Sequence, residues 1–344
     1  MTVEILVGDC RERMAELPDG CVQTCVTSPP YFGLRDYGVD GQIGAEVHPN
    51  DFCNVLVEVF REVRRVLRDD GTVWLNLGDS YCNTDKWGGG GDTGKNTIAP
   101  DGAVPSWAVR RKRPKMDGLK PKDRMMIPAR VALALQADGW WLRDEIIWHK
   151  PNPMPASVTD RTTPAHEMIY LLSKSPRYFY DVEAVKEPAK RWPGHTSKRQ
   201  GEFGGKGAAP GTGQSAFRAI TETRNRRSVW TVTTKPFKGA HFATFPPDLI
   251  EPCILAGCPI GGTVLDPFGG AGTTGLVAQA HGRNAILCEL NPEYASIARD
   301  RIDEAAATPL AAKKIRAKRA PKMVRGVQTA LFGQDSVPSP PRPV

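Results

Sequence analysis

Apolar residues are grouped along the chain in short runs that alternate with longer segments of mixed character. Most short runs are bounded by Gly, Pro or Asp, which is typical of buried strands. They predict strands at residues 3–7, 21–26, 72–77, 141–148, 167–172, 262–266 and 284–289. Segments between them, in which apolar side chains recur at helical spacing, predict helices at residues 11–17, 51–68, 127–138, 247–257, 274–281 and 291–306. Because strand, helix and strand follow one another, the pattern favours an α/β fold with a parallel sheet.

Two segments interrupt this pattern. Residues 86–122 and 185–227 are rich in Gly and in basic residues, and they have little apolar periodicity. They separate three ordered parts of the chain, residues 1–85, 123–184 and 228–306, and no internal repeat is visible. Residues 307–344 form a tail of Ala, Lys, Arg and Pro that we expect to be partly disordered. The sequence therefore predicts a core that is divided by two irregular inserts and followed by a tail.

Composition narrows the class of protein. The chain has 344 residues and a formal net charge of +8. The charge is concentrated in runs such as residues 110–113 and 313–316, which favours a polyanionic partner such as nucleic acid. We find no apolar run long enough to span a membrane and no signal peptide, so we expect a soluble, cytoplasmic protein.

The eight cysteines do not suggest a metal or redox site. They show no Cys-x-x-Cys spacing and no nearby histidine cluster, and several lie in strand-like runs. We therefore expect no metal site and no disulfide, but reduced cysteines in the core. The residues concerned are Cys10, Cys21, Cys25, Cys53, Cys82, Cys253, Cys258 and Cys288.

The most informative stretch is Thr27-Ser28-Pro29-Pro30-Tyr31, which directly follows a predicted strand. Two prolines stiffen the chain where it leaves the sheet, at the edge where open α/β sheets bind ligands. This arrangement suits methylation of an exocyclic amino group on a base, whose nitrogen lone pair is delocalised into the ring. Ser28 Oγ and the Pro29 carbonyl could accept hydrogen bonds from the amino group, and the Tyr31 ring could stack on a flipped base. The structural alternative is a simple Pro-Pro turn.

A second motif, Gly270-Ala271-Gly272-Thr273-Thr274-Gly275, lies between a predicted strand and a predicted helix. It matches the Gly-x-Gly-x-x-Gly pattern of dinucleotide-binding folds, so a nicotinamide-dependent oxidoreductase is a competing interpretation. Asp266 and Phe268 precede the glycines, where a carboxylate could meet the ammonium of S-adenosylmethionine. Glu289 follows the next strand, where it could accept hydrogen bonds from ribose hydroxyls. Hydride transfer also leaves the Ser-Pro-Pro-Tyr loop without a role, so we favour a methyltransferase.

Together, the two motifs resemble those of the DNA methyltransferases that modify the amino groups of cytosine N4 or adenine N6. The order of the parts is similar to that of the β class, with the catalytic loop first, target recognition in the middle and the cofactor loop last. The resemblance implies a doubly wound, mostly parallel, seven-stranded sheet. It implies a catalytic half in residues 1–85, a continuation in 123–184 and a cofactor-binding half in 228–306. It also implies target recognition by inserts 86–122 and 185–227.

The resemblance further implies roles for individual residues. Ser28, Pro29, Pro30 and Tyr31 would handle the target base. Asp9 would contact the adenine of S-adenosylmethionine, although Asp9 could equally cap the helix that follows it. Phe242, Thr244 and Phe245 would line the methionine end, although the two phenylalanines could simply be core residues. The other residues implied to hold the cofactor are Asp266, Phe268, Gly269, Gly270, Gly272, Thr273 and Glu289.

The target base is less clearly indicated. Adenine-N6 enzymes mostly carry Asp or Asn before Pro-Pro-Tyr, whereas serine, as in Ser28, is typical of cytosine-N4 enzymes. The resemblance therefore favours N4 of cytosine, with N6 of adenine as the alternative. A methyltransferase acting on RNA or protein, and a non-catalytic DNA-binding relative, are further alternatives.

Partners follow from the basic segments. We expect double-stranded DNA to be contacted by residues of the two inserts, namely Arg110, Arg111, Arg113, Lys115, Arg224, Arg226 and Arg227. In the tail, the segment from Gln328 to Phe332 resembles the peptide that docks on bacterial sliding clamps, with Leu331 and Phe332 as apolar anchors. A homodimer is also conceivable, since proteins of this class often pair.

Overall fold

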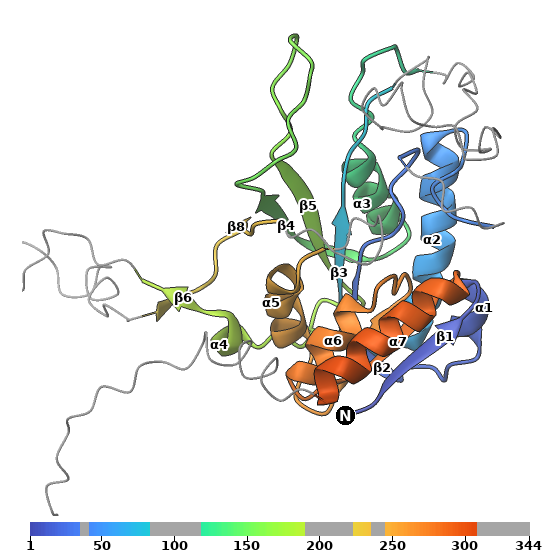
Figure 1. The fold of residues 1–344 in the computed structure, drawn as a ribbon, viewed down its shortest axis with the longest axis vertical. Coiled ribbons are helices and arrows are strands. Elements are labelled where there is room, and N and C mark those ends of the chain that lie inside the picture. The colour runs from blue at the N-terminus through green and yellow to red at the C-terminus, as the bar shows by residue number, and fades with distance from the viewer. Residues whose placement is uncertain (35–40, 83–117, 190–222, 235–244, 308–344) are drawn as a thin grey trace, which may run out of the picture.

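The structure is a computed structural model, and it describes residues 1–34, 41–82, 118–189, 223–234 and 245–307. Figure 1 shows one central sheet with helices packed around it. Its elements in chain order are β1 Val3–Val7, α1 Cys10–Ala15, β2 Val22–Thr27, α2 Pro49–Val66, β3 Leu67–Leu77, α3 Ile127–Ala137, β4 Trp141–His149, β5 His166–Ser173, α4 Val182–Val185, β6 Glu187–Pro188, β7 Thr223–Arg224, β8 Val229–Thr231, α5 Pro247–Gly257, β9 Thr263–Asp266, α6 Thr273–Ala280, β10 Asn284–Glu289 and α7 Pro292–Ala307.

The central sheet has the strand order β1-β10-β9-β2-β3-β5-β4-β8. All neighbouring pairs are parallel except those that β5 makes with β3 and β4. The mostly parallel α/β sheet is confirmed, but the sheet has eight strands rather than the expected seven. The added strand is β8, which has three residues and pairs with β4 at the edge. A run this short between irregular segments carries no detectable strand signal.

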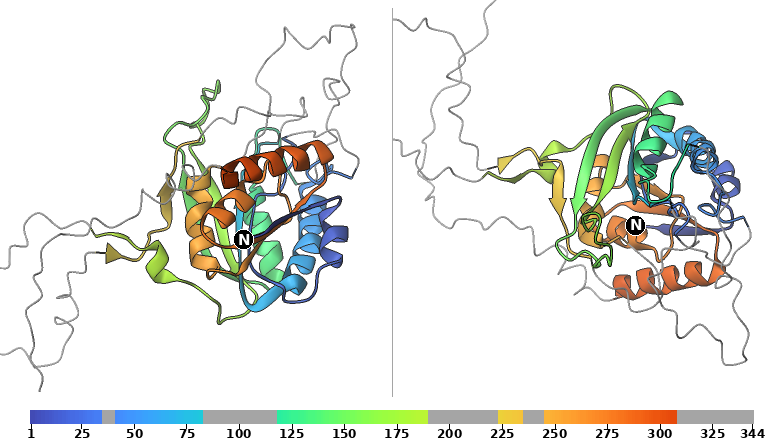
Figure 2. Two further views of the ribbon diagram at one scale, coloured as in Figure 1. Left: turned by 60° about the horizontal axis from the view of Figure 1, so that its bottom comes forward. Right: turned by 90° about the horizontal axis from the view of Figure 1, so that it is seen from above.

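Two layers of helices cover the sheet. One hydrophobic cluster joins α1, α2 and α3 to the sheet, and a second joins α5, α6 and α7 to it. Figure 2 shows these two groups on opposite sides of the strands. The central strand β2 is buried along its whole length. The fold is therefore doubly wound, and the sheet combines strands from the beginning, the middle and the end of the chain.

The ends of the second insert are more ordered than the sequence predicts. Residues 187–188 and 223–224 pair as the antiparallel strands β6 and β7. Helix α2 also runs directly into β3 at Leu67, without the turn that Asp69-Asp70-Gly71 suggests. Residues 83–117 and 190–222, which make up most of the two inserts, lie outside the described residues.

Several simpler expectations can be compared with the structure. All eight cysteines are free thiols, and all but Cys21 are buried. Among the described residues, no cluster of His, Cys, Asp or Glu has the geometry of a metal site. None of the helices in the same part of the chain is long and apolar enough to cross a membrane.

Candidate active site

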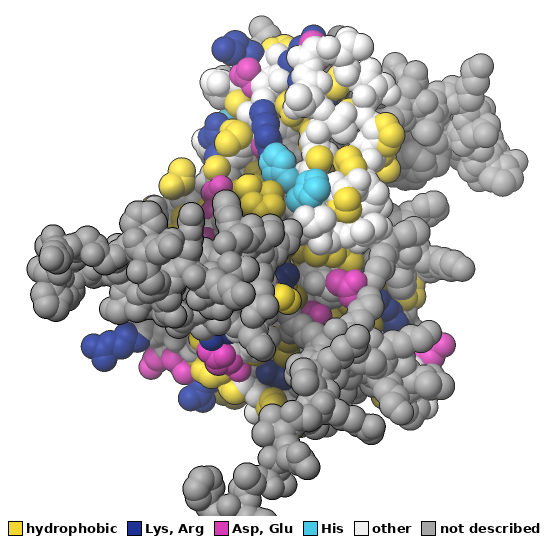
Figure 3. All heavy atoms as spheres, turned by 90° about the vertical axis from the view of Figure 1, so that its left-hand side faces the viewer, with side chains coloured by type: hydrophobic (Ala, Val, Ile, Leu, Met, Phe, Trp, Pro, Cys, Tyr) yellow, Lys and Arg dark blue, Asp and Glu magenta, His cyan; other side chains and the backbone are white. Residues whose placement is uncertain are grey.

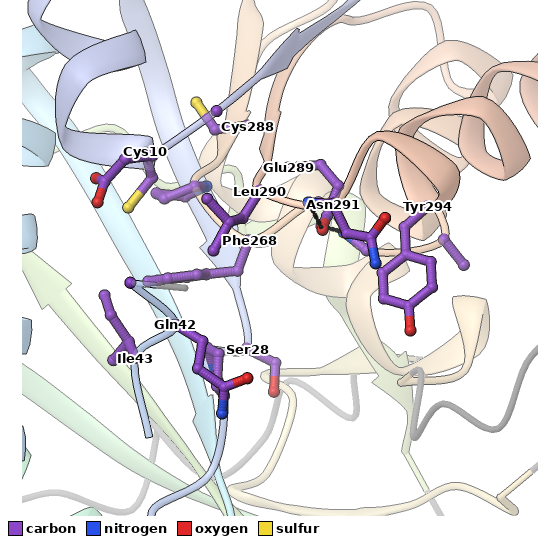
Figure 4. A pocket seen from close by; sticks show the side chains of 18 of the residues that line it. Cys10, Ser28, Gln42, Ile43, Phe268, Cys288, Glu289, Leu290, Asn291 and Tyr294 are labelled. Carbon is purple, nitrogen blue, oxygen red and sulfur yellow. Dashed lines mark hydrogen bonds between the residues drawn. The ribbon is translucent and has the colours of Figure 1, made fainter. Parts of the chain in front are cut away.

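A cavity lies at the carboxyl edge of the parallel strands, where β1, β2, β9 and β10 end. Its volume is about 1040 Å³, including the solvent in its mouth. Figure 4 shows Ser28, Gln42 and Phe268 on one side of the cavity and Asn291 and Tyr294 across from them. The lining residues are Gly8, Asp9, Cys10, Ser28, Pro30, Gly41, Gln42, Ile43, Phe245, Pro267, Phe268, Gly269, Gly270, Ala271, Thr273, Cys288, Glu289, Leu290, Asn291 and Tyr294.

The glycine loop after β9 forms one wall of this cavity. The Gly269 N–H donates to the Cys288 carbonyl at 2.8 Å, and the Gly272 N–H donates to the Gly269 carbonyl at 2.8 Å. Gly270 and Gly272 have φ angles of +50° and +74°, which favour glycine. A Cβ on Gly272 would lie 2.9 Å from the Cβ of Ala298 in α7. Gly272 therefore lets α7 approach the loop and is not among the residues that line the cavity, and its contact with a cofactor stays a prediction.

Glu289 occupies the position at the end of β10 that the sequence indicated. Its carboxylate accepts hydrogen bonds from the Gly270 N–H at 2.7 Å and from the Asn291 N–H at 2.9 Å. These bonds fix the carboxylate at the cavity wall, and burial raises its pKa. Each oxygen accepts one backbone N–H and retains a further lone pair, so both can accept a bond from a ligand hydroxyl.

Asp266 differs from its expected placement. Its side chain is buried beneath the loop, and the residue is not part of the cavity lining. The carboxylate accepts from the hydroxyls of Thr27 and Thr274, both at 2.6 Å, and from the Phe268 N–H at 3.1 Å. It therefore ties β2 and α6 to the loop. Direct contact of this carboxylate with a ligand ammonium stays a prediction.

Asp9 combines the two roles that the sequence left open. It is the N-cap of α1, accepts from the Arg11 N–H at 2.8 Å, and also lines the cavity. An ion pair with the Arg11 guanidinium, 2.6 Å away, lowers the pKa of the Asp9 carboxyl. The capping role is confirmed, and contact with a ligand adenine stays a prediction.

The loop after β2 presents Ser28 and Pro30 to the cavity. It is held in place by Phe32, which is buried with its ring centre 5.5 Å from that of Phe52 in α2. The Ser28 hydroxyl donates to Asn76 Oδ1 at 3.4 Å, and the Asn76 amide nitrogen donates to the Met168 carbonyl at 3.1 Å. Because the second bond orients the amide, Asn76 turns its oxygen toward Ser28.

Tyr31 lies beside the cavity and is not one of its lining residues. Its hydroxyl donates to Glu167 Oε2 at 2.7 Å and also lies 3.2 Å from Asn76 Oδ1. Glu167 is in turn ion-paired with Lys150, and both side chains are largely buried. A Cβ on Gly78 would lie 2.4 Å from the Tyr31 ring, so the ring rests directly against the end of β3. The ring is thus held from two sides.

Asn76, Lys150 and Glu167 are functional candidates that the sequence did not reveal. Asn76 carried one usable signal, since it is a polar residue near the end of an apolar strand. The other two come from β5 and from the loop that joins it to β4, and the antiparallel direction of these strands is not visible in the sequence. Gln42, Ile43, Asn291 and Tyr294 of the cavity lining were also missed.

The remaining predicted residues are placed as follows. Phe245 lines the cavity, whereas Phe242 and Thr244 lie outside the described residues. Arg224 and Arg227 are both paired with Glu187 Oε1, at 2.8 and 2.6 Å, and Arg226 lies over the Trp230 ring at 4.4 Å. These arginines brace β6, β7 and β8, so their contact with DNA stays a prediction. The predicted residues outside the described ranges are Arg110, Arg111, Arg113, Lys115, Gln328, Leu331 and Phe332.

Comparison with known proteins decides the family. The family model for N6/N4 methyltransferases, described as DNA methylase, matches residues 22–300. The chain belongs to this DNA methylase family. It is 48% identical over 295 residues to the type II methyltransferase M.Cfr9I of Citrobacter freundii, covering 86% of each chain. It is 46% identical over 299 residues to the type II methyltransferase M.SmaI of Serratia marcescens, covering 87% of this chain and 90% of the relative.

Solved structures agree with the fold. The PvuII DNA methyltransferase, named cytosine-N4-specific, has a TM-score of 0.58 at 18% identity, covering 89% of this chain and 92% of that chain. TTHA0409 of Thermus thermophilus, solved with S-adenosyl-L-methionine, has a TM-score of 0.51 at 24% identity, covering 88% and 96%. The solved structures support the fold, whereas membership of the DNA methylase family makes the protein a DNA methyltransferase that uses S-adenosylmethionine. The cavity, with its aromatic Phe268 and its fixed Glu289 carboxylate, fits that cofactor.

Proposed function

We propose that the protein methylates N4 of cytosine at a specific site in double-stranded DNA. The choice of cytosine is supported by the serine before Pro-Pro-Tyr, and the amino-group chemistry is supported by the pairing of the cavity residue Ser28 with Asn76. A serine hydroxyl can accept a bond from an amino group only when its own proton points elsewhere. Asn76 Oδ1 takes that proton, so the lone pairs of Ser28 Oγ are available to a base amino group.

The chain's own groups then prepare the amino nitrogen. Ser28 Oγ and the Pro29 carbonyl accept its two hydrogens, which favours a pyramidal nitrogen with a localised lone pair. When bound, S-adenosylmethionine would supply an electrophilic methyl group on sulfur. Tyr31, held by Glu167, limits how the flipped base can lie. The rate enhancement derives from positioning and electrostatics, and water receives the departing proton.

The roles of the other cavity residues form part of the same proposal. Phe268 would pack against the cofactor, and Glu289 would accept bonds from its ribose hydroxyls. Gly269, Gly270 and Thr273 line the cavity where close backbone approach is needed, and Phe245 also lines it. Asp9 would reach the adenine while it caps α1.

Nucleoside mass spectrometry tests the choice of base. Unmethylated plasmid DNA is incubated with the protein and methyl-labelled S-adenosylmethionine, digested and analysed. We expect label in N4-methylcytosine, and no label with Ser28→Ala despite unchanged binding of S-adenosylhomocysteine. Label in N6-methyladenine would keep the mechanism and replace the base. Absence of label in both nucleosides would contradict the proposal.

We also propose two partners beyond DNA. The sequence around Gln328, Leu331 and Phe332 suits docking on a sliding clamp, which would keep the enzyme near newly copied DNA. Pulldown of a purified clamp by the intact tail, lost with Leu331→Ala plus Phe332→Ala, is the expected result. Association into a homodimer is the second proposal, and sedimentation velocity tests it.

A further inference from the structure

The connection between β4 and β5, residues 150–165, projects from the edge of the sheet that carries the cavity. We call this segment the arm. Strand β5 is antiparallel to both β3 and β4, so β3 and β4 run in the same direction. Since β2 is parallel to β3, all three strands end at the same edge of the sheet. Figure 1 shows the arm extending above β4 and β5 beyond the ends of the other strands. A duplex that presents a base to Ser28 must therefore pass close to the arm.

Strands β3 and β5 lie between β2, which leads to Ser28, and β4, which leads into the arm. Three strand spacings amount to about 14 Å, so the arm begins about that far from the Ser28 loop along the edge of the sheet. The base of the arm is also linked to the catalytic loop, because Lys150 pairs with Glu167 of β5, and Glu167 accepts a hydrogen bond from the Tyr31 hydroxyl.

The side chain of Met154 in the arm is the most exposed large hydrophobic group in the described part of the chain, with 88% of its surface accessible. Pro153 and Pro155 flank it, so the backbone on both sides has fixed φ angles and lacks two N–H groups. Burying this apolar group requires an apolar partner. The gap between stacked base pairs is such a partner, and proteins that kink DNA insert Met, Leu or Pro into it.

The arm is fixed at its base, and the last fixed residue, Asn152, lies two positions before Met154. The Lys150 N–H donates to the Ala165 carbonyl at 2.8 Å. Asn152 exchanges two hydrogen bonds with the backbone of Thr234, at 3.2 and 3.1 Å. A rigid support matters because an apolar group inserted on a flexible loop would lose conformational entropy on binding.

Two basic side chains lie in or contact the later part of the arm, at residues 160 and 161. Lys122 reaches Asp160 of the arm at 2.7 Å while most of its own side chain stays exposed. Arg161 lies over the Tyr81 ring at 4.0 Å. In Figure 3, the upper part of the molecule carries mostly uncharged side chains with several Lys and Arg among them. These cations suit the phosphates that flank an opened base step.

We infer that Met154 inserts into the DNA base stack beside the target base and stabilises the flipped state. The inference rests on the base flipping of the proposed function, and it assigns a role to a segment outside both inserts. It predicts that Met154 matters when the target base must be extracted from a pair. It also predicts that Met154 matters little when the base is already unpaired.

The test uses a short duplex that carries the site at which the wild-type protein methylates plasmid DNA. A second duplex is identical except that the target base faces an abasic position. Single-turnover methylation is measured for the wild type, Met154→Ala and Met154→Leu. The matched control is Ile260→Ala, because Ile260 is 77% exposed but precedes β9 at the opposite edge of the sheet.

We expect Met154→Ala to lose about tenfold or more on the paired duplex, since unstacking one base step is costly. On the unpaired duplex it should match the wild type, and Met154→Leu and Ile260→Ala should match the wild type on both. Equal rates for Met154→Ala and the wild type on the paired duplex, or an equal loss on both duplexes, would overturn the inference.

If the wild type labels neither duplex, the proposed function itself fails. Label on the unpaired duplex upholds that function whatever the variants show.

Discussion

Replacing Lys150 with Met tests whether the ion pair beneath the catalytic loop stabilises the protein. The side chains of Lys150 and Glu167 are only 18% and 16% exposed, and the lysine ammonium lies 4.3 Å from the centre of the Trp148 ring. Methionine retains most of the aliphatic length, so the substitution removes the charge with little loss of buried volume. The Glu167 carboxylate then keeps the Tyr31 hydroxyl but loses the cation paired with it, and it remains in a poorly solvated position.

The size of the effect follows from this geometry. Removing one partner of a fully buried ion pair costs about 3–5 kcal/mol. Here the carboxylate retains a hydrogen bond from Tyr31 and some access to water, so we expect a loss of about 2–3 kcal/mol. Urea unfolding followed by circular dichroism measures it as a lower midpoint at an unchanged slope.

A second ion pair, between Lys122 and Asp160 of the arm, offers a matched control. Lys122 also pairs with a carboxylate, that of Asp160, at 2.7 Å, but the two side chains are 84% and 54% exposed. Exposed pairs contribute little because water solvates both charges and salt screens them. Lys122→Met should therefore leave the midpoint unchanged. Equal midpoints for the two variants would refute the argument that burial gives the Lys150 pair its strength.

Two further predictions concern the cavity. Gly78→Ala places a methyl group 2.4 Å from the Tyr31 ring and must displace that ring. The methylation rate should therefore fall about tenfold or more, while the affinity for S-adenosylhomocysteine, measured by calorimetry, stays constant. An unchanged methylation rate would contradict the contact between Gly78 and Tyr31. Burial raises the pKa of Glu289 above its ordinary value of 4.5. The affinity for S-adenosylhomocysteine should therefore fall as the pH drops toward that raised pKa, because the protonated carboxyl group is a weaker acceptor for the ribose hydroxyls. Glu289→Gln should remove this pH dependence. The raised pKa means that ionisation of Glu289 opposes folding. The free energy of unfolding of the wild type, measured relative to that of Glu289→Gln, should therefore decrease as the pH rises through the raised pKa. A difference that does not change with pH would contradict the raised pKa.

Most strands and helices could be predicted because each carries its own local pattern. The apolar run that becomes β2 and the helical spacing of α2 are properties of neighbouring residues. Strand direction is different, because an apolar run has the same pattern whether it pairs in parallel or antiparallel. The sequence therefore could not show that β5 is antiparallel to both its neighbours, or that the three residues of β8 pair with β4.

The same limit explains which of the predicted site residues line the cavity. Ser28 and Glu289 directly follow or end parallel strands, and such residues meet at one edge of the sheet. Asp266 also ends a strand, but its carboxylate turns beneath the loop because Thr27 and Thr274 offer hydroxyls there. Those two threonines lie in different elements, and only the folded chain brings them together.

The antiparallel pair β4–β5 connects the two ends of the proposed reaction. Glu167, at the start of β5, holds the Tyr31 hydroxyl, and Lys150, at the end of β4, holds Glu167. The arm begins at Lys150, so the segment that carries Met154 and the loop that carries Ser28 share one buried ion pair. A displacement of the arm by DNA would therefore act on Tyr31 through two short contacts. It follows that Lys150→Met should slow methylation more on a paired target base than on an unpaired one, as we expect for Met154→Ala, even though the Lys150 side chain is largely buried.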